Sequence, residues 1–76
     1  MKNLSDVLPG QTVLIREFQG NPSVVSRLQD FGFTPGCEVL LFAKQPLGGA
    51  VAVALRGTKI ALRCEDASCV LIQPLL

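Results

Sequence analysis

The 76-residue sequence contains no histidine, no tryptophan and no tyrosine, and each absence removes a class of function. Histidine is the commonest general base and metal ligand in proteins, so its absence argues against hydrolytic enzymes and metalloenzymes. Without tyrosine and tryptophan, the chain lacks the aromatic platforms that stack single-stranded nucleic acid or grip proline-rich peptides. We therefore expect a protein that is not an enzyme and has no catalytic residues.

Charged residues are also scarce, at 17% of the chain, and seven Lys and Arg against six Asp and Glu leave a net charge of +1. No global field attracts nucleic acid or anionic lipid, so a partner has to be recognised by shape and local contacts. The longest uninterrupted apolar run, residues 50–55, is too short to cross a bilayer, and the first ten residues lack the apolar core of a signal peptide. We expect a cytoplasmic protein that does not insert into a membrane.

Hydrophobic residues make up 49% of the chain, and their pattern predicts five short strands and one helix. No linker or low-complexity tract interrupts residues 1–76, which indicates a single domain. Asn21 as N-cap, Pro22 in the first turn, and apolar residues at 24, 28 and 31 predict a short helix over about Pro22 to Phe31. The predicted strands are Thr12–Phe18, Cys37–Lys44, Ala50–Arg56, Lys59–Arg63 and Cys69–Gln73.

Five short strands in so small a chain favour a curled, partly closed sheet, because a flat sheet would leave a long exposed edge. We predict a mainly β fold, a small SH3-like barrel with the helix inserted after the first strand. The predicted inward residues are Val13, Ile15, Val39, Leu41, Val51, Val53, Leu55, Ile60, Leu62, Val70 and Ile72. Several residues predicted to face outward are apolar as well, where a soluble barrel usually carries polar side chains: Leu14, Phe18, Leu40, Phe42, Ala52 and Ala54.

The segment Arg27–Val39 concentrates glycine and proline between the helix and the second strand. Gly32 stands where a helix ending needs a left-handed residue, and Phe33 stands where such an ending packs an apolar side chain against Leu28. Pro35 and the glycine after it are typical of a type II turn into a strand. The same Pro-Gly pair precedes the first strand at residues 9–10. This corner is therefore interpreted as architecture and not as a binding site.

The order and spacing of these residues resemble the FeoA family, small cytoplasmic proteins that accompany a large membrane GTPase-permease for Fe²⁺. The resemblance covers nearly the whole chain. Phe31 and Phe33 depart mildly from it, because the family more often has aliphatic residues there. The matching residues are Leu28, Phe31, Gly32, Phe33, Pro35, Gly36 and Val39 in the corner, Pro46, Gly48 and Gly49 in the middle, and Gly57, Ile60, Ala61, Leu62, Arg63, Ala67, Val70 and Ile72 towards the end.

The resemblance implies a non-enzymatic accessory module of bacterial ferrous iron uptake that docks on the cytosolic domain of the permease. The candidate docking residues are the outward apolar side chains and the hairpin tip, with the family's arginine as a further contact: Leu14, Phe18, Leu40, Phe42, Leu47 and Arg63. The alternative for the apolar surface is that the helix covers it and makes it a second small core. Self-association through the same patch is compatible with every interpretation.

Two other functions stay open at this point. The family is similar to SH3-like domains at the end of some iron-dependent repressors, so the chain is also a candidate regulatory domain acting in trans on a transcriptional regulator. A weak iron or metal sensor is the third, since "CEDASC" places Cys64, Glu65, Asp66 and Cys69 in one segment that would suit Fe²⁺ or Zn²⁺ if it folds them together. The purely structural interpretation is that the thiols of Cys64 and Cys69 flank a tight turn as small apolar side chains. We expect no cofactor and no metal.

Overall fold

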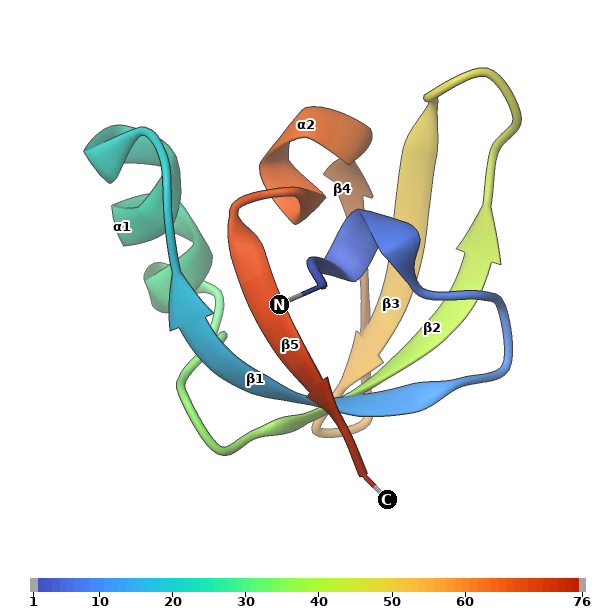
Figure 1. Cartoon of the computed structure of the whole chain (residues 1–76), viewed down its shortest axis with the longest axis horizontal. Helices are drawn as coiled ribbons and strands as arrows, with labels where there is room; N and C mark the ends of the chain where they lie inside the picture. Colours follow the sequence, from blue (N-terminus) through green and yellow to red (C-terminus); the bar gives the residue numbers. More distant parts are fainter. Residues whose placement is uncertain (1, 76) are drawn as a thin grey trace.

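The structure is a computed structural model that describes residues 2–75 (Figure 1). Its elements, in chain order, are the 3-10 helix η1 (Leu4–Asp6), β1 (Thr12–Phe18), α1 (Pro22–Asp30), β2 (Glu38–Lys44), β3 (Ala50–Leu55), β4 (Thr58–Arg63), α2 (Cys64–Ala67) and β5 (Val70–Pro74). All five strands pair antiparallel in one sheet, in the spatial order β4-β3-β2-β1-β5. The mainly β fold with one helix after the first strand is confirmed.

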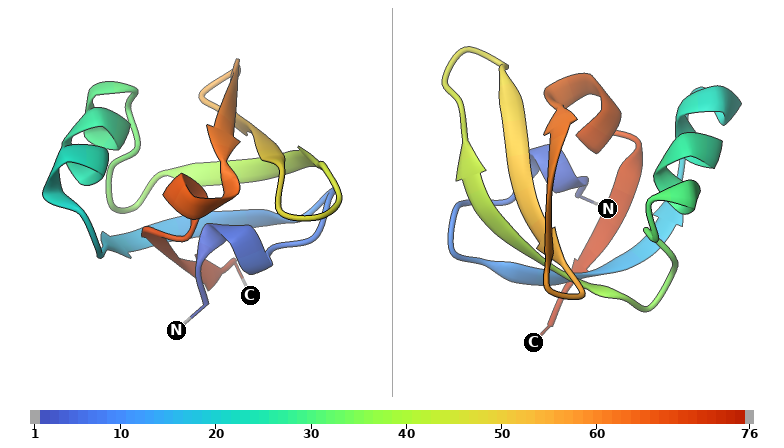
Figure 2. Two further views of the ribbon diagram at one scale, coloured as in Figure 1. Left: turned by 90° about the horizontal axis from the view of Figure 1, so that it is seen from above. Right: turned by 180° about the vertical axis from the view of Figure 1, so that it is seen from behind.

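Two irregularities in strand pairing curl the sheet into a cup. One interrupts the β1–β5 register between Ile15 and Glu17, and the other interrupts the β2–β3 register between Leu41 and Ala43. An extra residue at such a point bends the strand and increases its twist. The sheet stays open, because β4 and β5 form its two edges and the short helix α2 connects them. The concave side of the cup holds η1 and α2 (Figure 2).

The core fills the concave side of the cup. Each predicted inward residue is buried except Ile60, which is half-buried and packs against the core. Five further buried residues close the ends of the barrel from outside the strands: Leu4, Val7, Leu28, Phe33 and Ala67. A chain of this length buries little surface, so these end-closing residues form a sizeable part of its core.

Helix α1 begins and ends as the sequence predicts. The side chain of Asn21 accepts a hydrogen bond from the backbone N–H of Ser23 at 2.8 Å, which caps the first turn. At the other end, Gly32 has φ +101°, and the N–H of Phe33 donates to the carbonyl of Leu28 at 3.1 Å. This is a Schellman ending, and it buries both Leu28 and Phe33. The corner after α1 is therefore an architectural feature.

The two Pro-Gly turns occupy equivalent places at opposite ends of the β1–β2 pair. The N–H of Gly10 donates to the carbonyl of Leu41 at 2.8 Å, and the N–H of Gly36 donates to the carbonyl of Ile15 at 2.8 Å. Both glycines have φ +91°, and each turn carries the expected bond across four residues, from Gln11 to Leu8 and from Cys37 to Thr34. The repeated Pro-Gly motif thus reflects a local two-fold relation between the strands.

The structure differs from the sequence prediction in its short elements. The 3-10 helix η1 and the four-residue helix α2 were not predicted, and α2 replaces the turn expected between β4 and β5. Strand bounds shift by one residue at several ends. Arg56, for example, belongs to the β3–β4 turn with φ +52° and not to β3.

Candidate protein-docking surface

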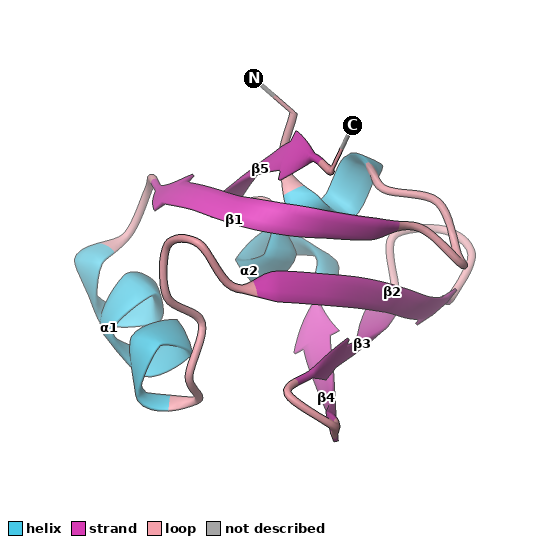
Figure 3. Ribbon diagram, turned by 90° about the horizontal axis from the view of Figure 1, so that it is seen from below, coloured by secondary structure: helices cyan, strands magenta, loops and turns pink. Residues whose placement is uncertain are grey.

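The outer surface of β1 and β2 carries apolar side chains that lie outside the core. Leu14 and Leu40 are half-buried residues on these neighbouring strands, where Leu40 pairs with Thr12 and Leu14 pairs with Glu38. Figure 3 looks onto this surface, and no helix crosses it. Helix α1 instead lies at the end of the barrel, where Leu28 joins the core and Val24 packs against it. The arrangement does not support the alternative that the helix covers this face.

The two phenylalanines predicted to face outward have different environments. Phe42 is 51% exposed on the outer surface, with the ammonium of Lys59 at 4.3 Å from its ring centre. Phe18 is half-buried and packs against the core. The irregularity after Ile15 reverses the alternation of β1, so Phe18 pairs with buried Val70 and faces inward. The prediction that Phe18 faces outward is wrong, and we do not retain it as a docking residue.

Leu47 stands at the tip of the β2–β3 hairpin and is fully exposed, at 103% of its reference area. Its φ of +62° lies in the left-handed region, and Gly48 follows with φ +73°. Left-handed backbone costs a residue with a Cβ atom about 1–2 kcal/mol. The hairpin itself is well defined, since the N–H of Gln45 donates to the carbonyl of Ala50 at 2.9 Å and the Gln45 side chain accepts from the N–H of Ala50 at 3.0 Å. Leu47 therefore adds nothing to the stability of the isolated chain and is presented to solvent on a fixed support.

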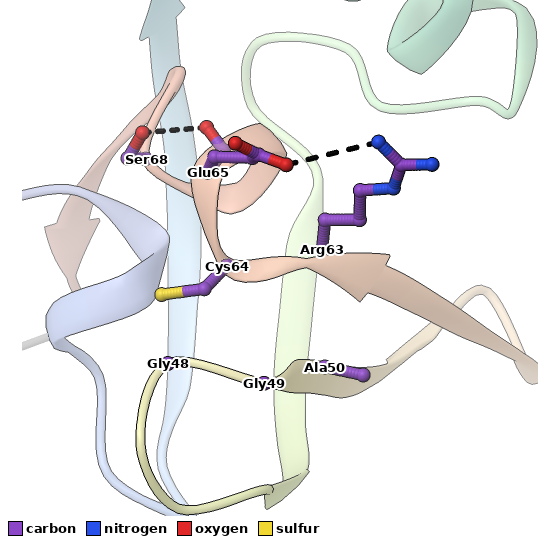
Figure 4. Close-up of a pocket in the computed structure, with 7 residues that line it drawn as sticks. All are labelled: Gly48, Gly49, Ala50, Arg63, Cys64, Glu65 and Ser68. Carbon is purple, nitrogen blue, oxygen red and sulfur yellow. Dashed lines mark hydrogen bonds and ion pairs between the residues drawn. The ribbon is translucent and has the colours of Figure 1, made fainter.

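A cavity of about 560 Å³ opens beside this hairpin tip (Figure 4). The hairpin contributes one wall through residues 48–50, and the corner between β4 and α2 contributes the other through Arg63, Cys64, Glu65 and Ser68. Arg63 is 80% exposed and forms a 3.7 Å ion pair with the exposed Glu65. Such a surface pair contributes little to stability, so the Arg63 guanidinium remains available to a partner.

The structure does not bring the four candidate metal ligands together. Glu65 pairs with Arg63, whereas Asp66 pairs with Arg27 of helix α1 at 3.4 Å. Cys64 lines the cavity, and the thiol of Cys69 donates to the backbone carbonyl of Glu65 at 3.7 Å. Within residues 2–75, no group of three or more His, Cys, Asp or Glu side chains converges on one point.

A third cysteine has a more distinctive environment, which the sequence prediction missed. The thiol of Cys37 lies 2.9 Å from the hydroxyl of Thr34 and accepts a hydrogen bond from the Arg56 guanidinium, also at 2.9 Å. The hydrogen bond with Thr34 is the largest influence on the pKa of Cys37 and lowers it; burial opposes this, and the contact with Arg56 lowers it further, so the pKa lies below its ordinary value of 9.0. In the sequence, Arg56 is followed by Gly57, a pair that favours a two-residue turn. In the structure this turn directs the Arg56 side chain towards Cys37, just before β2.

Comparison with known proteins identifies the class first. A curled antiparallel sheet of five short strands that is closed at its ends by short helices defines an SH3-like domain, and the structural neighbours below share it. The FeoA domain family matches residues 2–74, so this chain belongs to the FeoA family. Among curated proteins, no sequence matches this chain. In the part of the chain that the structure describes, no helix is long and apolar enough to cross a membrane.

Two solved structures of FeoA proteins resemble the chain over nearly all of its length. A FeoA-like protein from Clostridium acetobutylicum is 28% identical with a TM-score of 0.89, and the alignment covers 99% of this chain and 87% of that one. Zinc-bound FeoA from Stenotrophomonas maltophilia is 27% identical with a TM-score of 0.80, covering 96% and 91%. That protein is described as a prokaryotic SH3 domain protein, and a role as a ferrous iron transport activating factor has been suggested for it.

A manganese-dependent transcriptional repressor in complex with manganese shares the fold as well. It has a TM-score of 0.90 at 17% identity, and the alignment covers 97% of this chain but 36% of the repressor. At this level of identity the likeness concerns the fold alone. The expected likeness was to iron-dependent repressors, whereas this repressor depends on manganese, and the shared fold says nothing about a shared activity.

Proposed function

We propose that this chain is a non-enzymatic accessory module of ferrous iron uptake, which docks in the cytoplasm on the cytosolic domain of the GTPase-permease and modulates its activity. Membership of the FeoA family supports a role in ferrous iron transport. The observation that carries the docking proposal is Leu47, a fully exposed leucine held in a left-handed conformation at the tip of a defined hairpin. Protruding apolar anchors of this kind supply much of the binding energy of protein interfaces.

The surroundings of Leu47 fit an interface. The cavity beside it accepts a side chain from the partner, and Arg63 on the far wall offers a charge to an acidic group. Phe42 adds a second exposed apolar side chain on strand β2, the strand that leads into the hairpin, and Leu14 and Leu40 extend the apolar surface. An isolated barrel gains nothing from exposing these side chains, whereas a docked one buries them.

The proposal is tested by titrating detergent-solubilised permease with this chain in the GTP-analogue, GDP and nucleotide-free states. Leu47→Glu is expected to weaken binding roughly 30-fold or more, the loss typical of a central apolar anchor. The monomer should unfold at the same urea concentration or a slightly higher one, because Leu47 makes no stabilising contact in the isolated chain. Leu8→Glu is the matched control, since Leu8 is also an exposed leucine, at 61%, but lies in the Pro-Gly turn before β1.

Phe42→Glu tests the outer surface separately and is expected to weaken binding by a smaller factor. Equal affinities for wild type, Leu47→Glu and Phe42→Glu would refute docking through this surface. Sedimentation of the chain alone tests whether the patch instead binds a second copy of this chain. A dimer that Leu47→Glu dissociates would assign the hairpin tip to self-association.

A further inference from the structure

Strand β4 is an open edge of the sheet. It pairs with β3 over its whole length, from Ala50 opposite Arg63 to Leu55 opposite Thr58. Outside that pairing, no backbone hydrogen bond among residues 2–75 involves β4. The edge faces away from β3 towards helix α1, as the view from behind shows (Figure 2). An edge of this kind presents backbone donors and acceptors that a further strand can pair with.

The hairpin register identifies which backbone groups point outward. In a two-residue hairpin the closing pair, here Leu55 and Thr58, exchanges hydrogen bonds, and bonded and non-bonded pairs then alternate along the strands. The N–H groups of Lys59, Ala61 and Arg63 therefore point away from β3, as do the carbonyls of Lys59 and Ala61. The Arg63 carbonyl is left out of this count, because the chain turns into α2 directly after Arg63. Five groups are thus available to an added strand.

The opposite edge of the sheet shows what happens when an edge is occupied within the chain. There, the N–H of Ile72 in β5 donates to the carbonyl of Lys2 at 2.9 Å, and Asn3 forms a bridge with Leu71. The N-terminal segment covers β5 in an extended conformation. No described segment does the same for β4, so the two edges of one sheet differ in this respect.

A groove of about 270 Å³ runs beside the open edge. It is lined by Ala61 and Arg63 of β4, by Arg27 of α1 and Phe31 directly after that helix, and by Asp66 of α2. Phe31 is 53% exposed, so an apolar surface faces the strand edge across the groove. A bound extended segment would pair its backbone with β4 and lay the side chains of one face against α1.

Charge selects the occupant of this groove. Lys59 and Arg63, four residues apart, put two cations on the outer face of β4. Arg63 forms only an exposed 3.7 Å pair with Glu65, and Asp66 is paired with Arg27. A second copy pairing antiparallel about Ala61 would set Lys59 opposite Arg63 twice, and like charges directly opposite each other destabilise a strand pair. A segment with acidic side chains four residues apart would meet both cations favourably. The charges therefore disfavour self-association and favour an acidic partner.

We infer that β4 binds an extended segment of another protein by strand addition, and that this segment carries acidic residues at two positions four apart. Backbone pairing with Lys59, Ala61 and Arg63 supplies affinity, and the two cations supply selectivity and strand register. The inference rests on the backbone edge of β4 and not on the Leu47 side chain, although the two surfaces share Arg63.

The test uses the full chain and a synthetic nine-residue peptide, Thr-Val-Glu-Val-Thr-Val-Glu-Val-Thr, acetylated and amidated, followed by ¹⁵N–¹H NMR. The peptide is expected to shift the amide resonances of Lys59, Ala61 and Arg63 most strongly and to slow their hydrogen exchange. The amides of Ile60 and Leu62 already face β3, so their exchange should change less. A peptide with Lys in place of both Glu residues should bind about tenfold more weakly.

Ala61→Pro is the decisive variant. It removes an outward N–H while leaving the β3 pairing intact, because proline is tolerated on an edge strand where the N–H faces solvent. Affinity for the acidic peptide is expected to fall at least tenfold. Ala61→Val keeps the N–H and is the matched control, with affinity expected within threefold of wild type.

Three results would overturn the inference. They are peptide-induced shifts confined to another surface, unchanged binding by a folded Ala61→Pro, and a dimer of the free chain that forms through β4. If Ala61→Pro does not fold, wild-type hydrogen exchange decides the question. Slowed exchange at residues 59, 61 and 63 with the acidic peptide supports strand addition, and unchanged exchange there excludes it.

Discussion

The thiol of Cys37 is held between two hydrogen-bond partners on different segments. The Thr34 hydroxyl belongs to the corner before β2, and the Arg56 guanidinium comes from the β3–β4 turn. Both favour the thiolate, and the Thr34 hydrogen bond is the larger cause of the lowered pKa of Cys37. Cys37 should therefore be the thiol that reacts at lower pH than an ordinary cysteine.

Arg56→Asn removes the positive charge beside Cys37 and keeps the geometry of the β3–β4 turn. Asparagine tolerates the φ of +52° at this position and forms an Asn-Gly turn with Gly57, so the hairpin should be retained. Loss of the guanidinium is expected to raise the pKa of Cys37 towards 9.0, and Thr34→Val should raise it further. The rate of Cys37 alkylation by iodoacetamide against pH, resolved by peptide mass spectrometry, measures both effects. Identical profiles for the two variants and wild type would contradict this account.

The direction of the Cys37 pKa shift determines how the free energy of unfolding changes with pH. Because the folded-state pKa of Cys37 is lowered, its contribution to the free energy of unfolding is fully present above the unfolded value. That contribution is lost as the pH falls through the folded-state pKa. Arg56→Asn should therefore flatten the rise of stability with pH in the alkaline range.

At the scale of the elements, the stability of helix α1 depends on the glycine at its C-terminal end. Gly32 has φ +101°, and a Cβ atom added there would meet the Leu55 side chain at an ordinary 3.7 Å. Gly32→Ala thus costs backbone strain and not a steric clash, and we expect it to lower the free energy of unfolding by about 1–2 kcal/mol. Ser26→Ala, an exposed substitution within the same helix, is the control, with an expected change within about 0.5 kcal/mol. Urea denaturation monitored by circular dichroism measures both, and equal midpoints would show that the glycine ending is dispensable.

The elements also show where sequence patterns stop being informative. The five strands and α1 were predictable because alternation, the Asn21 cap and the glycine stop all agree. Helices η1 and α2 have three and four residues, too few for a periodic pattern, although Asn3 and Asp6 form a local capping box around η1. Phe18 was assigned to the wrong face because a strand irregularity leaves no mark in local composition.

Some of the candidate sites were predictable from the sequence alone, and others were not. Leu47 was predictable, because a leucine between proline and glycine at a hairpin tip has nothing to pack against. The open edge of β4 was not, since its outward groups depend on the hairpin register and on which strands remain unpaired. The Cys37 environment required the folded turn that places Arg56 beside it.

At the scale of the whole molecule, the N-terminal segment completes the core of an otherwise open cup. Leu4 is fully buried, and η1 packs against α2 and β5 on the concave side (Figure 1). The Asn3 side chain caps η1 by accepting from the N–H of Ser5 at 2.9 Å, and the ammonium of Lys44 in β2 donates to the Ser5 carbonyl at 2.7 Å. These contacts hold η1 across the mouth of the barrel.

Leu4→Ala is therefore expected to lower the free energy of unfolding by about 2–5 kcal/mol, the usual cost of emptying a buried leucine site. A chain of this length has a total stability of about 4–11 kcal/mol, so the variant should lose a large share of it. Leu8→Ala, four residues further along at an exposed position, should change the value by less than about 0.5 kcal/mol. Urea denaturation of both variants measures the difference. Equal midpoints would mean that the cup is stable without its N-terminal closure, and a selective loss in Leu4→Ala would show that the open sheet needs this segment to complete one cooperative core.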